Sequence, residues 1–133
     1  MKLIPEWYEH QYCLIAWPCN KDLYGEIINS ARDEVANVIN EIAKTEHVIV
    51  LSNKENINEI KSKTDHENIN ILECKLDDSW MRDIGPIFYT EDKKLKSISF
   101  DFNGYGKYAD YCNDNKISQF ISKIFEQYPT QND

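Results

Sequence analysis

Short segments of strand type alternate with helical segments through the first half of this chain. Residues 11–18 (QYCLIAWP), 47–52 (HVIVLS) and 68–74 (NINILEC) are short, apolar and rich in residues that favour strands. A helical pattern separates each of these segments from the next. The order strand, helix, strand, helix, strand favours an α/β fold with mixed sheet pairing, some of it parallel.

The longer helical pattern covers residues 21–47. Its apolar stripe comprises Leu23, Ile27, Ala31, Val35, Ile39 and Ala43, widened by Ile28, Val38 and Ile42. This spacing predicts one amphipathic helix that covers one face of the sheet. Ser52 and Glu55 resemble a capping box and predict a shorter helix that continues to residue 63.

The second half predicts a hairpin and a final helix. Residues 86–90 and 97–102 flank the polar turn 91–94, and the second of these strands buries Ile98, Phe100 and Phe102. The stripe of the final helix, residues 116–128, comprises Ile117, Phe120, Ile121, Ile124, Phe125 and Tyr128. Residues 129–133 are polar, and we expect them to be frayed.

Charge and composition exclude several partners. The chain of 133 residues has 15 Lys plus Arg and 23 Asp plus Glu, a net charge of −8. Nucleic acids and anionic membranes require positive charge and are excluded as partners, whereas a cationic small molecule suits an acidic surface. The apolar runs are too short to span a bilayer and the N-terminus does not resemble a secretory signal, so we expect a cytoplasmic protein.

The cysteines do not suggest a metal site. They are Cys13, Cys19, Cys74 and Cys112, and no two have CxxC spacing. The histidines are equally dispersed, so we expect reduced thiols and no bound metal.

Residues 77–88, DDSWMRDIGPIF, are the strongest candidate for a site, because they follow the third predicted strand. Ligands of α/β sheets usually bind beyond the carboxyl ends of strands. Asp83 could bind a guanidinium through two charge-assisted hydrogen bonds while the Trp80 indole packs on the planar cation. In the alternative interpretation, an Asp–Arg pair only stabilises the loop and Trp80 is a core anchor.

Three segments resemble one known family. Residues 80–86 match a W-x-R-D-x-G-P signature, 5–18 (PEWYEHQYCLIAWP) match an opening that ends in W-P, and 101–108 (DFNGYGKY) match an F-N-x-W/Y-G-x-K segment. They resemble the agmatine deiminase and bacterial (Porphyromonas-type) peptidylarginine deiminase family. The resemblance implies that residues 1–133 are a single N-terminal portion of a deiminase domain, which is a five-bladed α/β propeller. It also implies hydrolysis of a guanidinium group, in agmatine or a peptidyl-arginine, to a ureido group and ammonia without a cofactor.

The resemblance also implies roles for individual residues. Asp83 is expected to bind the guanidinium nitrogens, and Trp80 to line the same pocket. The rim of the pocket includes Asn103, Tyr105 and Lys107, and supporting positions are Asp78, Arg82 and Gly85. The fold anchors are Trp7, Trp17 and Pro18.

The catalytic groups of the family have no match in these 133 residues. The family's nucleophilic cysteine lies in a glycine-rich context and its histidine in a His-x-Asp pair, and neither pattern occurs here. We therefore expect a chain that is inactive alone, or one part of a split enzyme completed by a second chain, with a tendency to self-associate through exposed sheet edges. The alternative is a non-catalytic module that binds guanidinium or polyamine ligands or serves as an interaction protein.

Overall fold

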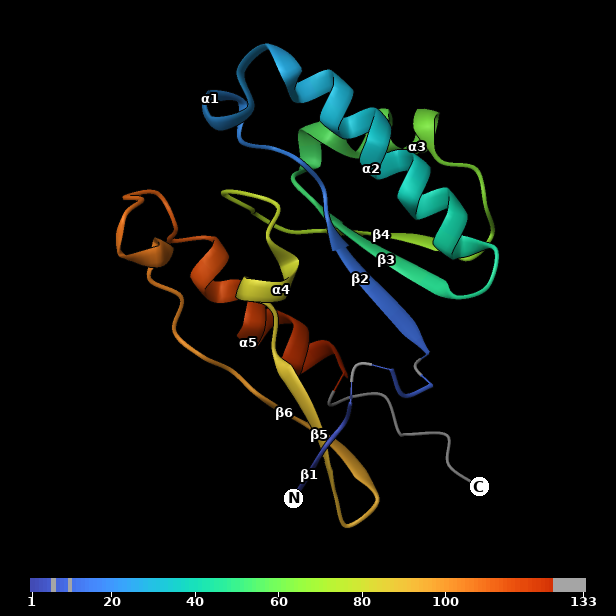
Figure 1. The fold of residues 1–133 in the computed structure, drawn as a ribbon, viewed down its shortest axis with the longest axis vertical. Helices are drawn as coiled ribbons and strands as arrows, with labels where there is room; N and C mark the ends of the chain where they lie inside the picture. The colour runs from blue at the N-terminus through green and yellow to red at the C-terminus, as the bar shows by residue number, and fades with distance from the viewer. Residues whose placement is uncertain (6, 10, 126–133) are drawn as a thin grey trace. The chain divides into compact units, whose positions relative to one another are not determined.

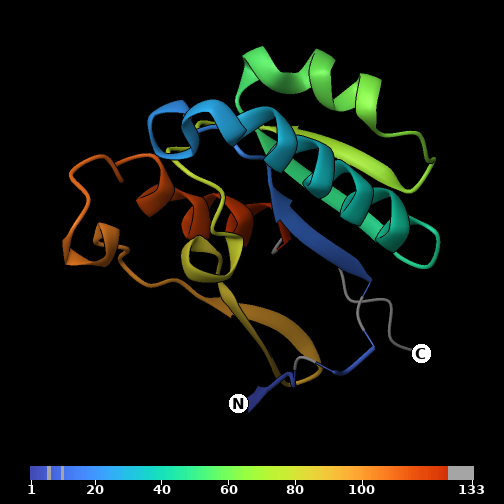
Figure 2. The ribbon, with the colours of Figure 1, turned by 45° about the horizontal axis from the view of Figure 1, so that its top comes forward.

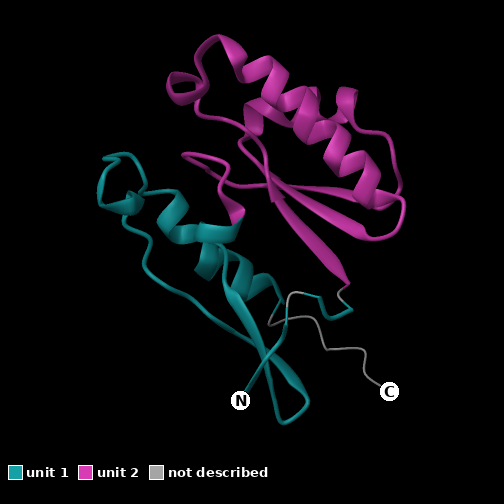
Figure 3. Cartoon of the chain, in the orientation of Figure 1, with its two compact units in different colours: residues 1–9, 82–133 teal, residues 10–81 magenta. Residues whose placement is uncertain are grey.

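The computed structural model describes residues 1–5, 7–9 and 11–125. The chain forms two compact units, one of Met1–Glu9 with Arg82–Asp133 and one of His10–Met81 (Figure 3). We call them the terminal unit and the central unit. Each contains one three-stranded sheet.

The central unit is built on a parallel sheet. Its strands are β2 (Tyr12–Ala16), β3 (His47–Ser52) and β4 (Ile69–Glu73), in the order β2-β3-β4. Helices α2 (Ile28–Ala43) and α3 (Ile57–Lys63), the latter preceded by the short helix η2 (Lys54–Asn56), connect them and lie on one side of the sheet (Figures 1 and 2). The predicted strands, the short helix and the parallel pairing are confirmed.

The core of the central unit lies between this sheet and its helices. It includes seven buried residues from α2, β3, α3 and the position directly after β2: Trp17, Ala36, Ile39, Ala43, Val48, Val50 and Ile60. The helices are therefore held on this face of the sheet by packed apolar side chains, with Ile69 and Ile71 of β4 partly buried against the same cluster.

The single helix predicted over residues 21–47 is wrong. The segment forms α1 (Lys21–Tyr24), the short helix η1 (Gly25–Ile27) and then α2, with Gly25 at a φ of 54°. A left-handed glycine ends a helix at little steric cost. Leu23 and Ile27, which lie in α1 and η1 and not in α2, are 47% and 64% exposed. Val38, also assigned to the predicted stripe, lies within α2 but is 52% exposed.

A buried arginine, Arg32, lies on the face of α2 that was predicted to carry only apolar residues. The Arg32 guanidinium donates to the carbonyl of Pro18 at 3.0 Å, to Glu59 Oε2 at 2.7 Å and to Asn56 Oδ1 at 3.1 Å. These contacts join α2 to α3 and to the chain that follows β2. The predicted capping box is also wrong, because Ser52 is the last residue of β3 and its hydroxyl donates to the carbonyl of Asn53.

The terminal unit contains an antiparallel sheet. Its strands are β1 (Lys2–Leu3), β5 (Ile87–Glu91) and β6 (Lys94–Ile98), in the order β1-β5-β6. The hairpin between β5 and β6 is confirmed, and its two-residue turn has left-handed φ values of 52° at Asp92 and 60° at Lys93. These values suit the twist of a two-residue hairpin.

The second strand of that hairpin lies earlier in the chain than the predicted range 97–102. It begins at Lys94 and ends at Ile98, so Phe100 lies beyond it and is 60% exposed. The period-two pattern of residues 97–102 continues past the last hydrogen-bonded pair, Ile87 with Ile98. Alternation alone therefore misplaced the end of the strand.

The final helix is α5 (Asp114–Phe125), which packs on this hairpin. The rings of Phe88 and Phe125 meet edge to face with centroids 5.6 Å apart, and the hydroxyls of Ser99 and Ser122 lie 3.2 Å apart. Tyr128 of the predicted stripe and the predicted frayed tail, residues 129–133, lie outside the described residues. No helix in the described part of the chain is long and apolar enough to cross a membrane.

Candidate functional site

The residues predicted to form the site belong to both units (Figure 3). The central unit contains Asp78 and Trp80. The terminal unit contains Arg82, Asp83, Gly85, Asn103, Tyr105 and Lys107. The geometry of each group is described within its own unit.

Trp80 is exposed and held at its ring nitrogen. Its Nε1 donates to Asp78 Oδ2 at 2.8 Å, and Asp78 Oδ1 accepts the backbone N–H of Ser79 at 2.8 Å. The residue is 49% exposed, which contradicts the alternative interpretation of Trp80 as a core anchor. Asp78 fixes the indole while a large part of the ring remains open to a planar cation.

Asp83 offers a carboxylate that is only partly engaged. It lies on the short helix α4 (Met81–Ile84), whose last residue, Ile84, is buried with 2% exposure. Asp83 Oδ2 accepts the hydroxyl proton of Tyr105 at 2.7 Å, and within the described part of the chain Oδ1 accepts no hydrogen bond. The neutral phenol leaves the negative charge uncompensated, so the carboxylate can bind a cation.

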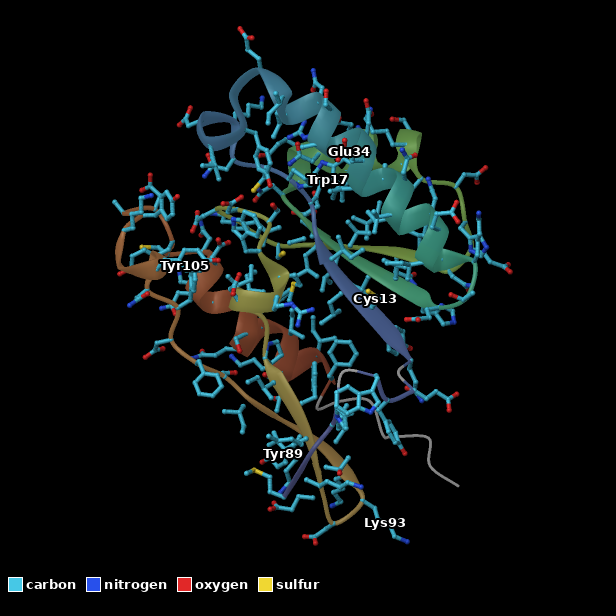
Figure 4. All side chains as sticks on the ribbon, viewed as in Figure 1. Cys13, Trp17, Glu34, Tyr89, Lys93 and Tyr105 are labelled. Carbon is cyan, nitrogen blue, oxygen red and sulfur yellow. The ribbon has the colours of Figure 1, made fainter. Side chains whose placement is uncertain are left out.

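Tyr105 reaches Asp83 from an unusual backbone turn between β6 and α5. Figure 4 labels Tyr105 in this turn. Gly104, Tyr105 and Gly106 have φ values of 62°, 59° and 67°. A Cβ at Gly104 would lie 2.7 Å from Tyr111 Cδ1, so only glycine fits there. The left-handed conformation costs a residue such as Tyr105 about 1–2 kcal/mol, and strain of this kind is common where a side chain must be aimed.

Aromatic rings support the same turn. The Tyr105 ring meets Phe102 edge to face at 5.0 Å and Tyr108 at 6.4 Å, and Phe102 also meets Tyr111 at 6.3 Å. Lys107 Nζ lies 5.3 Å from the centroid of the Tyr108 ring, a cation–π contact. The loop that contains Tyr105 is therefore packed rather than loose.

The remaining predicted positions have simpler surroundings. Asn103 is exposed and its carbonyl accepts the N–H of Gly106 at 3.1 Å. Arg82 is exposed on α4, and Gly85 follows that helix directly before Pro86 and β5. Trp17 is fully buried, whereas Trp7, expected to be a fold anchor, is 89% exposed.

Two residues that sequence reasoning missed hold the loop that carries Trp80. The Asn53 side chain bonds both backbone polar groups of Leu76, and the Tyr24 hydroxyl lies 2.7 Å from Ser79 Oγ. The only signal in the sequence was the position of Asn53 directly after a buried strand. In the described residues no group of three His, Cys, Asp or Glu side chains could hold a metal ion.

The cysteine environments differ in a way that labelling can test. The pKa of the Cys13 thiol is raised by its burial and by the nearby Glu46 carboxylate, whereas Cys112 is exposed. A raised pKa lowers the thiolate fraction near neutral pH, and the thiolate is the reactive form. We expect iodoacetamide at pH 7.5 to label Cys112 first and Cys13 much more slowly, with Cys13 labelling accelerating as the pH rises.

Peptide mass spectrometry measures both rates in one sample, and the Cys112→Ser variant serves as the control for peptide assignment. Labelling of Cys13 as fast as that of Cys112 would contradict the assigned environment.

The fold defines the class of protein. An agmatine deiminase of Enterococcus faecalis has the same fold, with a TM-score of 0.85 at 19% identity over 92% of this chain and 35% of that one. A C. jejuni agmatine deiminase with substrate bound matches with a TM-score of 0.79 at 27% identity, over 95% of this chain and 36% of that one. The mixed α/β structure is thus that of agmatine deiminases.

The sequence matches specify the family. Residues 2–133 match the Porphyromonas-type peptidyl-arginine deiminase family, to which this chain therefore belongs. A provisionally named agmatine deiminase of Mycoplasma capricolum is 35% identical over 125 residues, which are 90% of this chain and 34% of that relative. The agmatine deiminase of Stutzerimonas stutzeri is 30% identical over 90% of this chain. The chain spans about a third of the length of these relatives.

Proposed function

We propose that these 133 residues supply the guanidinium-binding part of an agmatine deiminase, as the N-terminal portion of its domain. The observation that carries the proposal is the Asp83 carboxylate, which is exposed and, among the described residues, accepts a hydrogen bond at one oxygen from the Tyr105 phenol. Such a carboxylate binds a guanidinium with charge-assisted hydrogen bonds. Trp80 supplies an open aromatic ring, and the similar proteins named agmatine deiminases favour agmatine over a peptidyl-arginine.

The proposed reaction is hydrolysis of the guanidinium to a ureido group and ammonia. A thiolate attacks the guanidinium carbon, ammonia leaves, and water then releases the N-carbamoyl product from sulfur. Asp83 would hold two N–H groups of the substrate, and the rim would comprise Asn103, Tyr105 and Lys107. The full arrangement we propose is the five-bladed α/β propeller implied by the family resemblance.

The thiolate and the proton-transferring histidine must come from outside these residues. Cys13 is half-buried with a raised pKa, the opposite of an activated nucleophile. Among the others, Cys19 donates to the carbonyl of Leu76 and Cys112 is exposed. We therefore propose that the 133 residues are inactive by themselves and act with the rest of a deiminase, in the same chain or in a second one, that carries the missing groups, or self-associate when alone.

An assay for the ureido product tests whether the catalytic groups come from outside these 133 residues. The 133-residue chain with agmatine should form no N-carbamoylputrescine, and addition of a separately produced deiminase segment with the glycine-rich cysteine and the His-x-Asp pair should restore product. The same mixture with that cysteine replaced by alanine is the control. Activity of the 133 residues alone would contradict the proposed inactivity, and a folded mixture without product would contradict the split enzyme.

A non-catalytic guanidinium-binding module is the second candidate, because Asp83 and Trp80 are already exposed in this chain. It requires binding without any complementing chain. Calorimetry with agmatine, arginine and putrescine separates the ligands, since putrescine has amines but no guanidinium.

A further inference from the structure

The segment that carries Trp80 has no helix or strand of its own, yet side chains from elsewhere in the central unit hold it. It follows β4 and runs from Cys74 to Trp80. Leu76 is buried with 5% exposure, while Trp80 at the end of the segment is 49% exposed. The position of the indole therefore depends on what fixes the backbone between them.

Asn53 fixes the first point of this segment. Its Nδ2 donates to the Leu76 carbonyl at 3.1 Å, and its Oδ1 accepts the Leu76 N–H at 2.9 Å. The Ser52 carbonyl accepts the N–H of Cys74 at 3.0 Å, so the ladder between β3 and β4 ends just before this point. The side-chain amide of Asn53 therefore adds one more rung beyond the end of the parallel ladder.

Tyr24 fixes the second point. Its hydroxyl lies 2.7 Å from Ser79 Oγ, and the backbone N–H of Ser79 donates to Asp78 Oδ1 at 2.8 Å. Asp78 Oδ2 in turn accepts Trp80 Nε1 at 2.8 Å. A continuous series of contacts thus connects α1 to the indole through Ser79 and Asp78.

We propose that Asn53 and Tyr24 are positioning residues for ligand binding, because they hold the 74–80 segment in the conformation that presents the Trp80 ring. This inference rests on the proposed guanidinium site. A ring that is already ordered loses less conformational freedom when a ligand binds, and affinity rises accordingly. In this proposal both residues act through the 74–80 segment and not by contact with the ligand.

The chain contains a matched control for Asn53. Asn40 likewise donates one hydrogen bond to the backbone and accepts one from it, but with two residues: Nδ2 donates to the Lys63 carbonyl at 3.0 Å and Oδ1 accepts the Asp65 N–H at 3.1 Å. It holds the loop that leads into β4, at the amino end of the parallel strands, whereas Asn53 acts at their carboxyl end. Asn40→Asp and Asn53→Asp therefore make the same chemical change at side chains that hold loops at opposite ends of the parallel strands.

The test labels the 133-residue chain with 5-fluorotryptophan and records its three ¹⁹F signals, one for each tryptophan. Trp80→Phe identifies the Trp80 signal. In the protein without ligand, Asn53→Asp should shift or broaden the Trp80 signal and leave the Trp17 signal unchanged, because aspartate cannot donate to the Leu76 carbonyl. Asn40→Asp should leave the Trp80 signal unchanged.

Calorimetry with agmatine gives the second readout. Asn53→Asp and Tyr24→Phe should each weaken binding about two- to tenfold, while Asn40→Asp leaves the dissociation constant within error. Tyr24→Phe removes one hydroxyl only and keeps the test valid if Asn53→Asp fails to fold. An unchanged Trp80 signal in both variants overturns the positioning role. If the unaltered chain gives the ¹⁹F spectrum of a folded protein but binds no agmatine, the guanidinium site is overturned instead. Failure of the positioning role and failure of the proposed site are therefore distinguishable.

Discussion

Asp83→Asn should weaken agmatine binding by about 10- to 100-fold while the melting temperature stays close to that of the unaltered chain. The asparagine keeps an oxygen that can accept the Tyr105 hydroxyl, now at 2.7 Å from Asp83 Oδ2, so the turn that contains Tyr105 retains its contact. What is lost is the negative charge, and a hydrogen bond to a charged group contributes about 1.5–3 kcal/mol. Calorimetry measures the affinity and circular dichroism the melting temperature.

Asp92→Asn is the matched control for this variant. Asp92 lies in the turn between β5 and β6 in the same unit, and its φ of 52° suits asparagine as well as aspartate. Both variants change the net charge by the same amount, so a general electrostatic effect would weaken binding equally in both. Equal losses in the two variants would contradict a specific role for Asp83, and a lowered melting temperature with unchanged binding would show that Asp83 only stabilises the loop.

Trp17→Ala should lower the free energy of unfolding by about 3–5 kcal/mol, the usual cost of replacing a fully buried tryptophan by alanine. Trp17 has 0% exposure, contacts the core cluster of the central unit, and its backbone N–H donates to the Leu51 carbonyl at 2.9 Å. Its ring nitrogen is buried and has no hydrogen-bond partner among the described residues. Trp17→Phe should therefore cost much less, because it removes an unpaired donor and leaves a smaller cavity.

Urea unfolding followed by far-ultraviolet circular dichroism measures both variants without depending on tryptophan fluorescence. Trp7→Ala is the matched control, since Trp7 is 89% exposed and its replacement should change the stability by less than about 0.5 kcal/mol. If Trp17→Phe proves as costly as Trp17→Ala, the indole N–H has a partner, such as an ordered water, that stabilises the fold.

The fold was predictable from sequence wherever the pattern was local. The strands β2, β3 and β4 and the helix α5 follow from runs of apolar residues with strand or helix periodicity. The break at Gly25 was not predicted, because the four-residue apolar spacing continues across it and masks a glycine with a left-handed φ. The end of β6 was misplaced for a similar reason, since alternation continues where hydrogen-bonded pairing stops.

The candidate site, like the fold, was predictable only where the signal lies in neighbouring residues. The motif around Trp80 and Asp83, and the family resemblance it supports, are properties of neighbouring residues that can be seen in the sequence. The partners of those two residues are not local: Tyr105 is 22 positions from Asp83, and Asn53 is 23 positions from Leu76.

The sequence by itself therefore determined the α/β class and the family, and it supplied the residues that we propose to hold a guanidinium, because periodicity and motifs are encoded in adjacent positions. Only the tertiary structure decided how those residues are held. The Tyr105 hydroxyl on Asp83 and the Asn53 amide on Leu76 depend on a left-handed turn and on the end of a strand ladder. Contacts of this kind form only when the folded backbone brings together positions that are distant in the sequence, so no pattern of neighbouring residues predicts them.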